Sequence, residues 1–100
     1  MDFNKNDFLD FWRRKILRGT SIDLEIWDCF GYFEATPYKD ITIRYNISEV
    51  RVSREGEVSF YCSTRVRQFH TGTTIVTESE FNRYAKEIRL HGELPDFLLD

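Results

Sequence analysis

Four side chains of this 100-residue chain have the chemistry of nucleophiles, general bases or soft metal ligands, and these are Cys29, Cys62, His70 and His91. Nucleophilic catalysis needs a serine or cysteine beside a base, and the pair to consider here is Cys62 with His70. Eight positions along a strand and a turn separate them, which does not set that geometry. None of the four stands at the two- to four-residue spacing typical of a zinc site. We therefore expect no catalytic residue, no metal and no cofactor, and a chain that is not an enzyme.

Carboxylates and glycines give the same expectation. The acidic pairs each fall at a predicted helix start, on the wet face of a strand or in a turn, where solvated charges are ordinary. The five glycines are scattered and match neither the P-loop nor the dinucleotide-binding fingerprint. A nucleotide site built on a glycine loop is therefore excluded.

The composition predicts one domain over residues 1–100. Apolar residues make up 41% of the chain and aromatic residues 16%, enough for one core at this length. The apolar runs are far shorter than the roughly 20 residues that cross a bilayer, and the start of the chain lacks a signal pattern. We therefore expect a cytoplasmic protein with reduced cysteines and no membrane partner. The net charge of −3 comes from interspersed acidic and basic side chains, which argues against a dedicated polyanion binder.

Helical patterns stand near both ends of the chain. Residues 7–18 carry an apolar stripe, with Asn4 or Asn6 as the N-cap and Gly19 as the closing residue. Residues 78–91 begin at a capping box formed by Thr77 and Glu80, and their apolar residues recur at helical spacing. We therefore predict a helix over each range.

Between the helices, alternating apolar residues predict strands. The pattern changes parity near Ser48, which predicts an interruption of the strand that begins at Ile41. Gly56 predicts a hairpin turn over residues 54–56, and a second turn is expected at Thr71–Gly72. Residues 36–40 are interpreted as a loop, and a bulge is expected near Asp28.

These elements predict an α+β domain in the order α-β-β-β-β-α. The N-terminal and C-terminal helices pack on a four- or five-stranded, mainly antiparallel sheet. Residues 93–100 form a tail that docks either on the domain or on a partner.

Nucleic-acid binding is one functional alternative. Tyr61 with Arg44, Arg65 and Arg67 could stack a base and hold phosphates from one face of the sheet. The order of elements also resembles that of a double-stranded RNA-binding domain, whose final helix begins with basic residues. Here Glu78 and Glu80 occupy that position and would repel phosphate, so another protein is the favoured partner.

The sequence thus favours a non-enzymatic protein-binding module, an inhibitor or adaptor that occupies a surface of a larger partner. Its size and build are common among accessory proteins of phages and mobile elements, which is an association of style and not a family match. A homodimer or larger homo-oligomer, burying the tail and an edge strand, is the third alternative. The expected partner-binding residues are aromatic, apolar or arginine side chains: Trp27, Arg44, Tyr61, Arg65, Arg67, Phe97 and Leu98.

Overall fold

The computed structural model describes residues 4–24, 31–38 and 40–90. Two helices and six strands follow one another there: α1 (Lys5–Lys15), β1 (Thr20–Asp23), β2 (Gly31–Tyr38), β3 (Ile41–Val52), β4 (Val58–Val66), β5 (Phe69–Thr77), α2 (Glu78–Tyr84) and β6 (Ala85–Leu90). Every strand pairing is antiparallel, in the order β5-β4-β3-β2-β6, with β1 also paired to β3. The α+β class with an antiparallel sheet is confirmed. The sheet has six strands where four or five were expected, and the second predicted helix is present as α2 but is followed by strand β6.

Helix α1 has the predicted N-cap at Asn4, but it begins at Lys5, before the predicted start at residue 7, and it ends earlier than predicted. The Asn4 side chain accepts the backbone N–H of Asp7 at 2.8 Å, and Ile16 is already extended. The predicted end at residue 18 is wrong because the following turn is held by β3. There the N–H of Gly19, at φ +82°, donates to the carbonyl oxygen of Val52 at 2.8 Å.

Strand β3 is the longest strand and contains the predicted interruption. Ile47 lies opposite Cys62 and Glu49 opposite Tyr61, so Ser48 is the extra residue of a β-bulge. The bulge inverts the alternation of the strand, because an added residue shifts the side-chain parity by one. Ile47 and Val50 can therefore both be buried although three positions separate them.

Two of the predicted loops are placed differently in the structure. Residues 36–38 belong to β2, where Pro37 lies in a register shift between Ala35 and Tyr38 and so costs no regular ladder bond. The hairpin turn at Gly56 is confirmed, with φ +90°. The turn expected at Thr71–Gly72 is wrong, because the chain reverses at residues 67–68 and Gly72 lies within β5 at a register shift.

The last predicted helix is only half helical. The capping box of Thr77 and Glu80 is confirmed, but α2 stops at Tyr84 and the next residues pair with β2. Ala85 lies opposite Ala35 and Glu87 opposite Glu34, so the strand is bulged at residue 86. This bulge places Ala85 and Ile88 on one face, so the spacing that predicts a helix is also satisfied by a bulged strand.

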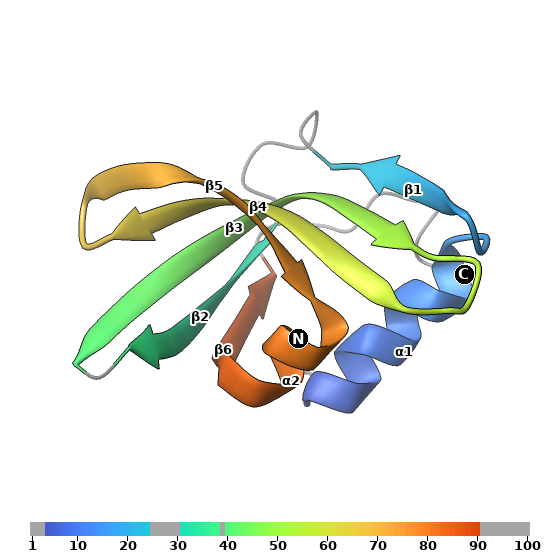
Figure 1. The fold of residues 1–100 in the computed structure, drawn as a ribbon, viewed down its shortest axis with the longest axis horizontal. Coiled ribbons are helices and arrows are strands. Elements are labelled where there is room, and N and C mark those ends of the chain that lie inside the picture. The colour runs from blue at the N-terminus through green and yellow to red at the C-terminus, as the bar shows by residue number, and fades with distance from the viewer. Residues whose placement is uncertain (1–3, 25–30, 39, 91–100) are drawn as a thin grey trace.

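Both helices pack on the same face of the sheet, which we call the inner face. Phe8 of α1 stacks on Phe60 of β4 with ring centroids 5.5 Å apart, and Phe81 of α2 lies 5.1 Å from the same ring. Figure 1 shows the helices gathered near one end of the sheet, while the β2–β3 and β4–β5 hairpins extend away from them. Helices α1 and α2 therefore cover one end of the inner face, and no helix of residues 4–24, 31–38 and 40–90 covers the other end.

Candidate functional site

Three of the predicted partner-binding residues are on the face of the sheet opposite α1 and α2, which we call the outer face. Arg44 of β3 lies directly opposite Arg65 of β4, and Tyr61 is on the same face of β4. Arg67 lies apart from them, in the β4–β5 turn with φ +57°. The other three predicted residues, Trp27, Phe97 and Leu98, lie outside the described residues, as do the tail 93–100 and the bulge expected near Asp28.

Two of the arginines on the outer face are already engaged within the sheet. The guanidinium of Arg44 lies 4.0 Å from the ring centroid of Tyr32 and pairs with Glu34 at 3.3 Å. The guanidinium of Arg51 lies 4.9 Å from the ring of Tyr61 and pairs with Glu49 at 3.6 Å. Such compensated charges attract phosphate less than free arginines would, so the outer face is a weaker polyanion site than its arginine content suggests.

Strand β5 forms one edge of the sheet. Among the described residues it pairs only with β4, which leaves the backbone groups along its other side without a strand partner. Its sequence from Phe69 to Thr77 holds no Asp, Glu, Lys or Arg, and Ile75 is 49% exposed. Natural proteins usually protect such an edge with charges, proline or a short strand. The run 69–77 without Asp, Glu, Lys or Arg was the sequence signal for this feature, but only the strand order shows that it is an edge.

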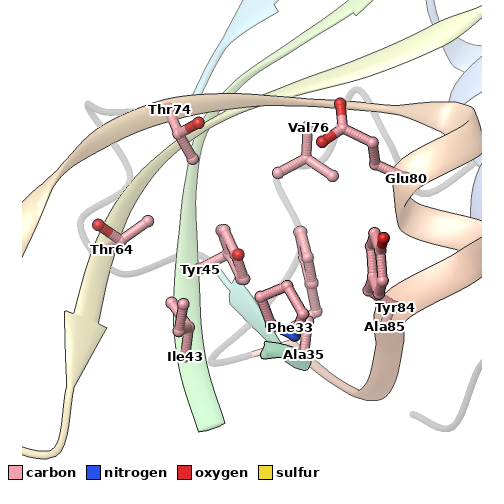
Figure 2. A pocket seen from close by; sticks show the side chains of 11 residues that line it. Phe33, Ala35, Ile43, Tyr45, Thr64, Thr74, Val76, Glu80, Tyr84 and Ala85 are labelled. Carbon is pink, nitrogen blue, oxygen red and sulfur yellow. The ribbon is translucent and has the colours of Figure 1, made fainter. Parts of the chain in front are cut away.

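A cavity of about 250 Å³ lies on the inner face beside β5. Strands β2 to β5, helix α2 and the start of β6 all contribute to its wall. Figure 2 shows Ile43 and Tyr45 on one side of it, Tyr84 and Ala85 on the other, and Val76 with Glu80 at one end. Sequence reasoning missed this site, because its residues come from segments far apart in the chain.

A second hollow lies where the two hairpins end. It has a volume of about 620 Å³ and is bordered by apolar side chains of three strands, Ile41, Val66 and Phe69. Phe69 is 73% exposed and Ile41 is 42% exposed. The open end of the inner face therefore presents apolar surface next to the edge strand β5, an arrangement typical of a binding site for another molecule.

The structure separates the one cysteine–histidine pair that it describes. Cys62 points to the inner face and is 2% exposed, whereas His70 lies opposite Arg65 and is therefore on the outer face. No group of three His, Cys, Asp or Glu side chains within residues 4–24, 31–38 and 40–90 is placed to hold a metal ion. Cys62 and His70 thus cannot act as nucleophile and base in this arrangement.

Burial also makes the Cys62 thiol unreactive, because desolvation of the thiolate raises its pKa well above the ordinary value. In a Cys29→Ser variant, where Cys62 is the remaining thiol, we expect negligible labelling by a thiol reagent at pH 8 and full labelling in urea. Fast labelling of the folded protein would contradict the burial of Cys62. A Thr73→Cys variant in the same background, exposed on β5, is the positive control.

No family model, curated protein or solved structure matches this chain.

Neither helix in the described part of the chain is long and apolar enough to cross a membrane.

Proposed function

We propose that this chain is a non-enzymatic protein-binding module that accepts an extended segment of a partner protein along the free edge of β5. The observation that carries the proposal is an edge of nine residues without Asp, Glu, Lys or Arg, beside the apolar end of the inner face that neither α1 nor α2 covers. Strand addition to such an edge gains backbone hydrogen bonds, while alternate side chains of the added segment reach the surface on either side. An inhibitor or an adaptor could act in this way by occupying a segment of its target.

The opposite edge of the sheet supports this choice by contrast. Strand β6 has six residues and carries Lys86 and Glu87, both common devices against unwanted strand pairing. Strand β5 is longer, and its exposed positions are mainly threonines with Ile75 and Phe69. The contrast is therefore the one expected if β6 is protected against pairing and β5 is used for pairing.

The predicted residues on the outer face would contribute at the border of such an interface. Arg65 lies opposite His70 of β5, and Tyr61 lies opposite Ile75, so both are one strand away from the edge. Tyrosine and arginine are frequent anchors of protein interfaces. The proposal thus keeps Tyr61 and Arg65 as partner-binding residues and places Arg44 one strand further from the partner. Trp27, Phe97 and Leu98 stay sequence predictions.

Two alternatives share parts of this surface. A nucleic-acid binder would use the outer face, and the paired arginines there make this the weaker reading. A homodimer would pair two β5 strands, which the absence of like charges along β5 allows. We propose the cytoplasm as the site of action, supported by the buried free thiol of Cys62.

Lysine substitutions along β5 test the proposal. Thr73→Lys and Ile75→Lys place charges on the edge strand, and we expect each to reduce recovery of bound partner from a native lysate at least tenfold. The matched control is Ser63→Lys, because Ser63 lies opposite Thr73 on the same face but one strand inside the sheet. If all three variants recover as much partner as the unchanged protein, the proposal is refuted. If only Ser63→Lys reduces recovery, the partner binds the outer face and not the edge. Light scattering measures the molar mass of the unchanged protein and of the lysine variants. If the variants have half the mass of the unchanged protein, the partner is a second copy of this chain.

A further inference from the structure

We propose that the cavity between β5 and α2 binds an ammonium group carried on an apolar stem. Eight of the eleven described residues that line it are aromatic or aliphatic, Thr64 and Thr74 add hydroxyl groups, and Glu80 is the one charged residue among those eleven. Its volume is about 250 Å³. This space fits a phenethylammonium ion or the side chain of a lysine.

The aromatic rings of the wall suit a cation. Phe33 is fully buried and stacks on Tyr45 with centroids 4.9 Å apart, so the rings that a ligand can reach are those of Tyr45 and Tyr84 on opposite sides of the cavity. Ring faces carry partial negative charge, so a cation near these two rings is attracted, and more strongly where water is excluded. Tyr45 is only 9% exposed, which gives the cavity a desolvated floor.

Glu80 supplies a negative charge at the rim of the cavity that complements the positive charge of an ammonium group. Its carboxylate accepts hydrogen bonds from the backbone N–H and the hydroxyl of Thr77, at 3.4 and 3.1 Å, and this capping box holds it at the rim. No ion pair joins Glu80 to any cation in the described part of the chain, unlike Glu34, Glu49 and Glu78. An incoming ammonium group would therefore find an available carboxylate whose position is already fixed.

The ammonium could belong to a free small amine or to a lysine of the segment bound along β5. The second source rests on the proposed function, and the geometry supports it because Thr74 and Val76 of β5 line the cavity. Side chains of an added strand that face inward would lie beside these two residues. The chemistry recognised is the same in both cases.

Titration of the protein with phenethylamine, 2-phenylethanol and phenylacetate at pH 7 tests the inference, with methyl NMR shifts of Val76, Ile43 and Ala85 as the readout. We expect the ammonium compound to bind about fivefold more tightly than the neutral alcohol, the ratio that a rim carboxylate can supply, and phenylacetate to bind weakest. Glu80→Gln should remove this preference while keeping the capping box, because glutamine serves equally at that position. Glu55→Gln, at an exposed turn, is the matched control.

Occlusion of the cavity is the second arm. Thr74→Phe should block binding of phenethylamine, whereas Thr74→Val, of nearly equal volume, should not. Two short threonine- and valine-rich peptides that differ in one residue, lysine or norleucine, then distinguish the sources. If the lysine peptide binds about fivefold more tightly than the norleucine peptide, and Glu80→Gln removes this difference, the ammonium belongs to a bound segment. If only phenethylamine is preferred over its neutral analogue, the ammonium belongs to a small amine.

Equal binding of amine and alcohol together with equal binding of both peptides would overturn the inference. The inference is also overturned if the Glu80→Gln variant keeps every preference of the unchanged protein. In that case the proposed function still stands if the norleucine peptide binds the protein and the Thr73→Lys variant does not bind it. The two proposals can therefore fail separately.

Discussion

Replacing Phe81 with alanine is expected to lower the free energy of unfolding by about 3–5 kcal/mol. Phe81 is fully buried, and its ring centroid lies within 5.8 Å of the rings of Phe8, Phe33 and Phe60. These three residues belong to α1, β2 and β4, so the lost ring would leave a cavity where four elements meet. A domain of this size is stabilised by only about 5–15 kcal/mol, so the loss is a large fraction of the total.

Urea unfolding followed by circular dichroism measures this change. Phe69→Ala is the matched control, because Phe69 is 73% exposed and its truncation should change the free energy of unfolding by less than about 0.5 kcal/mol. Similar losses for the two variants would show that Phe81 is not at the centre of the core. The measurement also checks that α2, which carries Glu80, is held by this ring.

Glu78→Ala is expected to lower the free energy of unfolding by about 2–3 kcal/mol. One carboxylate oxygen of Glu78 accepts the backbone N–H of Val58 at 3.1 Å and also bonds to the guanidinium of Arg13. Arg13 in turn donates to the carbonyl oxygen of Gly56 at 3.3 Å and to Asp10 at 3.0 Å. This group of contacts joins α1, the β3–β4 hairpin and the start of α2.

Most of the expected loss comes from the N–H of Val58. The Arg13 and Glu78 side chains are 28% and 25% exposed, so their ion pair alone contributes at most about 1 kcal/mol. Val58 is fully buried, and an orphaned donor there costs about 1–3 kcal/mol. Partial burial of Arg13 lowers its pKa, but hydrogen bonds to Asp10 and Glu78 outweigh that effect and raise it, so the guanidinium stays charged.

Two further variants separate these contributions by urea unfolding. Glu78→Gln keeps an oxygen that can accept from Val58 and should lose only about half as much stability as Glu78→Ala. Asp10→Asn removes the exposed partner of Arg13 and should cost less than about 1 kcal/mol. A Glu78→Ala loss no larger than that of Asp10→Asn would contradict the role assigned to the Val58 N–H.

Features held together by neighbouring residues could be read from the sequence. The Thr77–Glu80 capping box, the cap at Asn4 and the Gly56 hairpin each depend on bonds that span only a few positions. The interruption at Ser48 was also predictable, because the change of parity in the apolar pattern is itself local. The class of fold followed from these signals.

Pairing between distant segments decided the rest. Ala85 and Ile88 satisfy a helix and a bulged strand equally well, and the edge of β2 selects the strand by offering backbone partners. Arg67, not Gly72, takes the positive φ of the β4–β5 turn because the register with β4 places the reversal there.

The candidate sites divide in the same way. The alternation of residues predicted that Cys62 is a buried thiol and that Arg44, Tyr61, Arg65 and Arg67 share a face, and it was wrong only for Arg67, which the β4–β5 turn removes from the strand. The free edge of β5 and the cavity at Glu80 depend on strand order, which local patterns do not specify. Backbone hydrogen bonds are the same for every residue type, so a strand's neighbours are chosen by the packing of the whole sheet.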